Sequence, residues 1–164
     1  MCGWFGYGAA AADNRQLVDR MAGALARFDA SSIEALSGGK GALAVAANSE
    51  SAHVYQKGGL LAAVWGQVGF KDARLAHLAR TEGVAKTLAE GWMDKGAPVF
   101  ADLSGAFSLC ILDEGAGEAV LAIDRMGTRP LSYQISNESL IFGSSADVLA
   151  LHPLTRAEID PQGL

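Results

Sequence analysis

A cysteine follows the initiator methionine directly, and this pair of residues could carry chemistry. Cysteine is small enough for processing enzymes to remove Met1, which would leave Cys2 with a thiol and a free α-amino group. An α-amino group with an ordinary pKa near ~8 can take the proton of a neighbouring nucleophile, directly or through a water. Cys2 is therefore a candidate nucleophile that carries its own base. The alternative is a small hydrophobic residue on an N-terminal strand.

The other cysteine and the histidines indicate no second site. Cys110 stands in the apolar run 107–112, which is typical of a buried strand. Two cysteines make neither a disulfide framework nor a set with metal-ligand spacing. Residues 37–41, Ser-Gly-Gly-Lys-Gly, lack the Lys-Ser/Thr ending of a phosphate loop and predict a turn. We expect no metal and no cofactor in this domain. The histidines are scattered along the chain, at His53, His77 and His152.

The composition limits the partners of the chain. It has 164 residues, of which 50% are hydrophobic and 19% charged, so it can form a packed core in one domain. The net charge of −5 is spread without an acidic tail or a basic block, which does not favour nucleic acid. No apolar run reaches the roughly 20 residues that span a bilayer. Asp13 and Arg15 interrupt any N-terminal signal pattern. We expect a cytoplasmic protein with no membrane contact.

The elements that would position Cys2 begin with an aromatic strand over 4–7. A helix follows, which Asp13 or Asn14 could cap. Its buried side is indicated by apolar residues at helical spacing, namely Leu17, Val18, Met21, Leu25 and Phe28. Three strands are then expected, over 42–47, 52–56 and 60–68.

The second half of the chain predicts helices first and strands afterwards. Helices are expected over 72–79 and 81–93, the second capped by Thr81 and ended by Gly-Ala-Pro at 96–98. A short helix over 145–151 would end the fold. Between them we expect four antiparallel strands, over 105–112, 119–123, 131–135 and 140–143. This order predicts an α+β fold in layers, with two antiparallel sheets face to face and helices outside.

Four motifs carry a resemblance to a known family. Residues 1–6, Met-Cys-Gly-Trp-Phe-Gly, are similar to M-C-G-I-x-G, and residues 103–108 match L-x-G-x-F-A. Residues 124–133, Asp-Arg-Met-Gly-Thr-Arg-Pro-Leu-Ser-Tyr, match D-R-x-G-x-[KR]-P-L-Y-Y. Residues 140–153 follow L-x-F-A-S-E-x-x-A-L-x-x-H-P. Over nearly its whole length the chain resembles the N-terminal glutaminase domain of asparagine synthetases and related class II glutamine amidotransferases.

The resemblance implies a four-layer αββα sandwich of the N-terminal-nucleophile (Ntn) hydrolase type, and a mechanism. The thiol of Cys2 would attack the side-chain amide of glutamine, the α-amine would shuttle the proton, and ammonia would leave. Water would then hydrolyse the thioester to glutamate. If Met1 stays in place, the nitrogen of Cys2 is part of a peptide bond and this mechanism is closed.

The resemblance also implies a division of the longer protein. Residues 1–153 would form the glutaminase-like domain, and residues 154–164 would begin a linker towards a C-terminal synthetase domain. That synthetase domain would use ATP and Mg, and would receive the ammonia through the protein.

The substrate contacts depart from the family pattern. The strand that holds the oxyanion and the substrate amine reads N-G-E in the family and Trp65-Gly66-Gln67 here. The N–H of Gly66 could still donate, but the Asn side-chain donor is lost, at a cost of about 3 kcal/mol of barrier. Gln67 is neutral where a carboxylate would bind the substrate ammonium. Alternation does not decide whether Trp65 fills the glutamine pocket or faces the other side, because a strand buried on both faces loses its period of two.

Charged residues depart from the pattern as well. Arg80 stands in place of the acidic residue of the family's D-[TS]-E motif and would repel an ammonium group. No arginine lies within 42–68 to bind the substrate carboxylate. Asp124 and Arg125 are expected to form a structural charge pair, and Arg129 to serve a turn or a domain contact.

Three functions stay open at this point. The first is a degenerate glutaminase-like domain beside a synthetase domain that forms an amide with ATP. The second is a working Cys2-dependent amide hydrolase, with glutamine or, through Arg80, an anionic amide as substrate. The third is a non-catalytic interaction domain, for example of a lasso-peptide-type cyclase.

Overall fold

The computed structural model describes residues 1–6, 11–27 and 32–156. The strands and helices of the first half are β1 (Cys2–Phe5), α1 (Ala11–Ala26), β2 (Ser32–Ser37), β3 (Gly41–Ala47), β4 (Ala52–Lys57), β5 (Leu60–Phe70), α2 (Ala73–Glu82) and α3 (Val84–Lys95). Those of the second half are the 3-10 helix η1 (Ala97–Asp102), β6 (Leu103–Asp113), β7 (Glu118–Ile123), β8 (Ser132–Ser136), β9 (Ser139–Gly143) and α4 (Ala146–Leu149).

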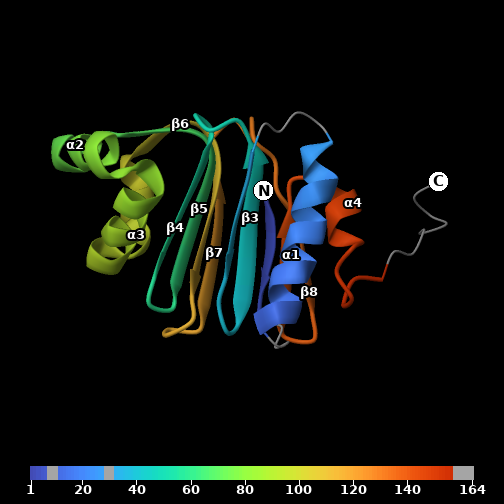
Figure 1. Ribbon diagram of the computed structural model, residues 1–164. Coiled ribbons are helices and arrows are strands. Elements are labelled where there is room, and N and C mark those ends of the chain that lie inside the picture. The colour runs from blue at the N-terminus through green and yellow to red at the C-terminus, as the bar shows by residue number, and fades with distance from the viewer. Residues whose placement is uncertain (7–10, 28–31, 157–164) are drawn as a thin grey trace.

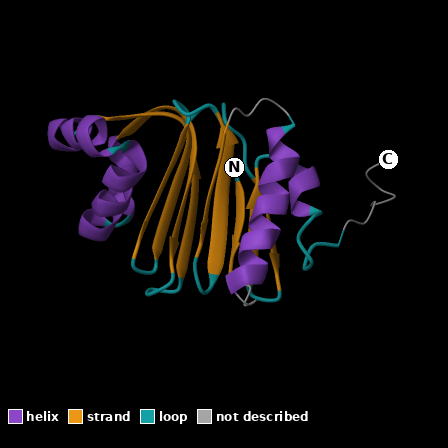
Figure 2. Cartoon of the chain, in the orientation of Figure 1, coloured by secondary structure: helices purple, strands orange, loops and turns teal. Residues whose placement is uncertain are grey.

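The strands form two antiparallel sheets that pack face to face (Figure 1). One sheet has five strands in the order β2-β3-β1-β9-β8, and the other has four in the order β4-β5-β6-β7. Helices α1 and α4 cover the outer face of the five-stranded sheet, and α2 and α3 cover the outer face of the other (Figures 1 and 2). The predicted α+β sandwich with αββα layers is confirmed.

Apolar residues fill three layers between these elements. Leu61, Phe142 and Cys110 belong to the layer between the two sheets, and Cys110 is fully buried, as its apolar run predicts. Leu60 and Ala62 of β5 face α2 and α3 instead, so this strand is buried on both faces. Such a strand reads as a continuous apolar run, which is why the sequence pattern does not assign its sides.

Strand β1 is central in the five-stranded sheet and brings the N-terminus into the core. Cys2 pairs with Ala44 of β3 and with Gly143 of β9. The strand ends before Gly6, whose φ of +92° is open to glycine at little cost. The strand expected over 4–7 begins earlier and covers Cys2–Phe5, because pairing on both sides extends to the first residues, and residue 7 lies outside the described residues.

Several expected element boundaries are wrong. Helix α1 begins at Ala11, and Asn14 is buried within it rather than capping it, because the preceding alanines are strong helix formers. Phe28 lies outside the described residues. Asp72 caps α2 by accepting hydrogen bonds from the N–H groups of Arg74 and Leu75. Strand β2 was not expected, since its residues are mostly half-buried and give a weak pattern.

The expected cap at Thr81 is also wrong. Thr81 lies in the last turn of α2, where its hydroxyl donates to the carbonyls of His77 and Leu78. Gly83 separates α2 from α3 with a φ of +98°. The glycine rather than the threonine therefore ends one helix and starts the next. In the described part of the chain, no helix has the length and apolar character needed to cross a membrane.

Candidate functional site

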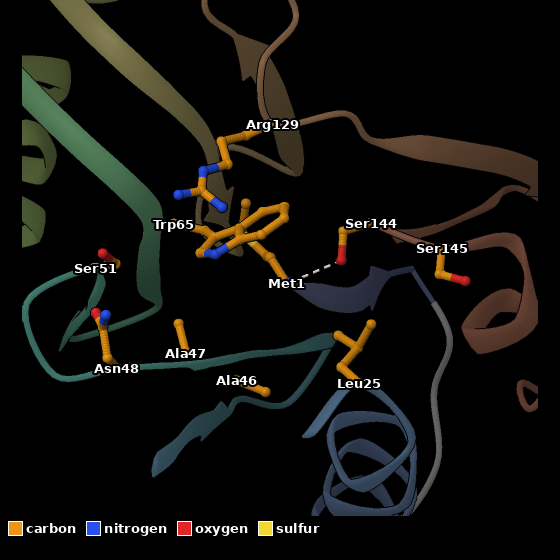
Figure 3. A pocket seen from close by; sticks show the side chains of 10 residues that line it. All are labelled: Met1, Leu25, Ala46, Ala47, Asn48, Ser51, Trp65, Arg129, Ser144 and Ser145. Carbon is orange, nitrogen blue, oxygen red and sulfur yellow. Dashed lines mark hydrogen bonds between the residues drawn. The ribbon is translucent and has the colours of Figure 1, made fainter. Parts of the chain in front are cut away.

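A pocket of about 470 Å³ opens beside the N-terminus (Figure 3). Its lining comes from both sheets, from α1, from the β3–β4 turn, and from the segments before β8 and after β9. The lining residues are Met1, Leu25, Ala46, Ala47, Asn48, Ser51, Trp65, Arg129, Ser144 and Ser145. Parts of the chain that are distant in sequence thus meet at the end of β1, where the family resemblance places the nucleophile.

Met1, and not Cys2, lines this pocket. Successive residues of a strand point to opposite faces. The side chain of Met1 packs in the layer between the sheets, whereas Cys2 packs with Met21 and Leu149 in the layer under α1 and α4. Cys2 is fully buried there, and burial raises the pKa of its thiol to about 12. A thiol in this state is neutral and poorly nucleophilic at neutral pH.

The α-amino group of Met1 is held inside the protein. Its nitrogen donates to Oγ of Ser144 at 3.1 Å, and the carbonyl of Met1 accepts a hydrogen bond from the N–H of Ser144 at 2.8 Å. Burial lowers the pKa of this amino group to about 6, and the positive charge of Arg129 acts in the same direction. With Met1 present, its weakly basic amino group therefore lies at the pocket, while the thiol of Cys2 lies on the opposite face of the sheet, under α1 and α4.

The segment Trp65-Gly66-Gln67 is tied to the β3–β4 turn. The N–H of Gly66 donates to the carbonyl of Ser51 at 2.8 Å, and Nε2 of Gln67 donates to the carbonyl of Glu50 at 3.0 Å. Gly66 has a φ of +114°, and a Cβ there would lie 2.2 Å from the carbonyl oxygen of Ala106. The N–H of Gly66, which would donate to an oxyanion, is thus already hydrogen-bonded to the carbonyl of Ser51.

Trp65 lines the pocket and packs against the layer between the two sheets, so its side chain is on the inner face of β5. Its indole is half-buried between Met1 and Arg129 (Figure 3). The guanidinium carbon of Arg129 is 4.7 Å from the centroid of the ring, within the range of a cation–π contact. The aromatic side chain therefore fills space in the pocket and supports a positive charge there.

The loop that carries Arg129 is built around the carboxylate of Asp124. This carboxylate accepts hydrogen bonds from the N–H groups of Phe107, Met126 and Thr128 and from the hydroxyl of Thr128. The Thr128 hydroxyl is the main cause that lowers the pKa of Asp124, and the backbone donors add to it. Arg125 is not among the partners of Asp124, so the expected charge pair is wrong and the carboxylate organises the loop instead.

Arg129 is the site residue that sequence reasoning missed. The family's carboxylate-binding arginine is on an early strand, and no arginine lies within 42–68, whereas Arg129 comes from a loop of the second half. The motif D-R-x-G-x-[KR]-P could have indicated it, because that motif requires a cation directly before the proline. Its spatial neighbour Trp65 could not be inferred from sequence spacing.

Two other predicted site residues lie away from the pocket lining. Gln67 is exposed on β5, bonded to the turn as described. Arg80 is exposed on α2, the helix that with α3 covers the outer face of the four-stranded sheet (Figure 1). The structure thus brings Trp65 to the N-terminus and leaves Cys2, Gln67 and Arg80 outside the lining. Among the described residues, no group of three or more His, Cys, Asp or Glu side chains could hold a metal ion.

Comparison with known proteins agrees with this architecture. The sequence model of a family described as "Glutamine amidotransferase domain" matches residues 69–164, which is more than half of the chain. The chain belongs to this family. The match includes the motifs at 103–108, 124–133 and 140–153, whereas Cys2 and Trp65 lie before it.

Two relatives come from Bacillus subtilis (strain 168). "Asparagine synthetase [glutamine-hydrolyzing] 2" is 26% identical over 110 residues, which are 65% of this chain and 15% of the relative. "Asparagine synthetase [glutamine-hydrolyzing] 3" is 34% identical over 62 residues, 38% of this chain and 10% of the relative. The chain therefore spans a small fraction of the relatives it matches. The motif resemblance to the N-terminal glutamine amidotransferase domain of asparagine synthetase-like proteins is confirmed.

Proposed function

We propose that this domain no longer hydrolyses glutamine and serves as the glutaminase-like part of an ATP-dependent, amide-forming enzyme. The observation that carries the proposal is the position of Cys2. Its thiol is fully buried on the helix side of the sheet, its pKa is raised to about 12, and Met1 occupies the pocket lining instead. A nucleophile must be ionised and must reach its substrate, and both conditions fail in this arrangement.

The oxyanion contacts support the same proposal. A tetrahedral intermediate needs donors aimed at its negative oxygen, and losing one costs about 3 kcal/mol of barrier. Trp65 takes the place of the family's Asn donor, and the N–H of Gly66 is engaged with Ser51. Hydrolysis would have to break this bond before the remaining donor became free.

Charge in the pocket also disfavours free glutamine. Among the described residues, the lining contains Arg129 and no Asp or Glu. The ammonium group of glutamine would thus find no acidic partner there and would be repelled by the guanidinium. We expect glutamine to bind poorly even if its amide could reach a thiol.

The partner in this proposal is a C-terminal synthetase domain. The matched relatives are asparagine synthetases of which the chain covers 15% and 10%. ATP and Mg would bind to that second domain, where a carboxylate would be activated for amide formation. Within this proposal residues 1–153 remain the glutaminase-like domain, residues 154–164 lead towards the synthetase, and the enzyme works in the cytoplasm, where ATP is supplied.

The test is the release of ammonia and glutamate from millimolar glutamine by two preparations. One retains Met1, as verified by intact mass, and the other is cleaved from a fusion so that it begins at Cys2. We expect both to release no more than the Cys2→Ala variant does. The matched control is Cys110→Ala, which removes the other buried thiol. Glutamate production that is lost in Cys2→Ala and kept in Cys110→Ala would overturn the proposal.

One observation favours a second function, a Cys2-dependent amide hydrolase that is formed by removal of Met1. Met1 lines the pocket and lies next to Cys2 in the chain, so its loss would free space there and expose a new α-amine. The preparation that begins at Cys2 separates the two functions. In this second case it would hydrolyse the amide, and the form that retains Met1 would not.

A further inference from the structure

We propose that the pocket beside the N-terminus binds a small organic acid, with its carboxylate paired to Arg129. The ligand class is a carboxylate with a short polar tail and no neighbouring ammonium group. This proposal holds whether or not Cys2 hydrolyses an amide, because it uses residues of the pocket and not the thiol.

Arg129 is positioned for a ligand rather than for the fold. Among the described residues it forms no ion pair, and its guanidinium carbon lies over the Trp65 ring, 4.7 Å from the centroid. The side chain is half-buried, so water compensates its charge only in part. A guanidinium over the face of an indole can keep its N–H donors free for a ligand, and their planar fork matches a carboxylate through two parallel hydrogen bonds.

The loop geometry fixes the guanidinium where a ligand would meet it. The carboxylate of Asp124 takes up four hydrogen bonds from the loop and from β6, so it is not available to Arg129. These hydrogen bonds hold the loop together without using the arginine. The remaining charge on Arg129 faces the pocket (Figure 3).

The other lining residues define the rest of the ligand. The side chains of Asn48, Ser51 and Ser145 can bond a polar group such as an amide, while Leu25 and Ala46 give an apolar wall. A volume of about 470 Å³ is within the range of small-molecule sites. Arg129 is the charged side chain among the described lining residues, so a ligand that carries an ammonium beside its carboxylate would lose affinity.

The test uses glutaramate, the monoamide of glutarate, which is glutamine without its amino group. Binding is measured by calorimetry and by the fluorescence of Trp65, whose share of the signal is identified with Trp65→Phe. We expect glutaramate to bind at least about tenfold more tightly than glutamine or the neutral diamide glutaramide, as is usual for a charge-assisted contact. Equal affinity for glutaramate and glutaramide would overturn the proposal.

The variant Arg129→Gln is expected to lose about tenfold or more in affinity for glutaramate. Arg125→Gln is the matched control, because Arg125 is an exposed arginine of the same loop that does not line the pocket. Should Arg129→Gln fail to fold, Arg129→Lys retains the charge but not the planar fork, and is expected to weaken binding severalfold.

Unchanged affinity in a folded Arg129→Gln or Arg129→Lys would contradict the assignment. Displacement of glutaramate by equal concentrations of acetate would contradict it too, since the site would then recognise any small anion. Ammonia is measured in the same samples, so hydrolysis is scored separately from binding and the two proposals can fail independently.

Discussion

Met1 and Cys2, adjacent in the chain, have their side chains on opposite faces of the five-stranded sheet. Met1 packs between the two sheets with Phe142, and Cys2 packs beneath α1 and α4. The register of β1 fixes this, because Cys2 is aligned with Ala44 on one side and Gly143 on the other. Moving Cys2 to the pocket would require a slip of one residue, which exchanges the faces of the whole strand.

The first prediction concerns the reactivity of the two thiols. Cys2 and Cys110 are buried, and burial raises the pKa of both. We expect an aromatic disulfide reagent at pH 8 to titrate neither thiol in the folded protein and both in denaturant. A fast-reacting thiol in the folded protein that disappears in Cys2→Ala would contradict the placement of Cys2.

The second prediction concerns Ser108, a fully buried residue of β6 opposite Trp65. Among the described residues its hydroxyl has no hydrogen-bond partner. Leaving such a group unsatisfied costs about 1–3 kcal/mol. Ser108→Ala is therefore expected to raise the free energy of unfolding by about 1 kcal/mol, measured with a chemical denaturant.

Ser32→Ala is the control for Ser108→Ala. The hydroxyl of Ser32, also on a strand, donates to the carbonyl of Ala47 at 2.9 Å. Its removal is expected to lower stability by about 1 kcal/mol. If Ser108→Ala lost stability as Ser32→Ala does, the Ser108 hydroxyl would have a hydrogen-bond partner that stabilises the fold.

The third prediction is a dependence of stability on pH that arises from His152. This residue is buried beside Trp4, with 5.2 Å between ring centroids, and Nδ1 accepts a hydrogen bond from the N–H of Leu154. Burial lowers the pKa of His152 from 6.5 to about 4, with the charge of Arg20 as a second cause. The folded state therefore favours the neutral imidazole.

The sign of the effect follows from these two pKa values. The stabilisation is complete above pH 6.5 and is lost as pH falls towards 4, because the unfolded chain takes up the proton first. The total is at most about 3 kcal/mol. The free energy of unfolding, measured with a denaturant, should fall less between pH 7.5 and pH 4 in His152→Gln than in the wild type. The control His77→Gln, which changes an exposed histidine, should lose as much as the wild type. Parallel curves for all three proteins would exclude this role for His152.

The sequence predicts the layers and most strands because their signals are local. Apolar runs and turn residues mark β3 to β7 and β9, and the motif at 124–133 marks the loop before β8. The side to which Cys2 points is not a local property, since it depends on the register of β1 against β3 and β9. The contact of Arg129 with Trp65 also depends on folding, as the two residues belong to elements far apart in the chain. The site is harder to predict than the fold because it depends on strand register and on contacts between distant parts of the chain.

The last prediction concerns Asp124 as the organiser of the loop that carries Arg129. In Asp124→Asn the side chain keeps one acceptor oxygen, and its NH₂ group is placed against backbone N–H groups that also donate. We expect a loss of about 1–3 kcal/mol in unfolding free energy and faster amide exchange at Met126 and Thr128, whose N–H groups now bond to the carboxylate.

Asp113→Asn provides the comparison for Asp124→Asn. The carboxylate of Asp113 accepts hydrogen bonds from Gly115 and Ala116 in the exposed turn between β6 and β7. Water can replace these bonds, so the expected loss is less than about 1 kcal/mol. Because Arg129 depends on the loop, Asp124→Asn should also weaken glutaramate binding while Asp113→Asn leaves it unchanged. If both variants lost equal stability and kept equal affinity, the carboxylate of Asp124 would not be what positions Arg129.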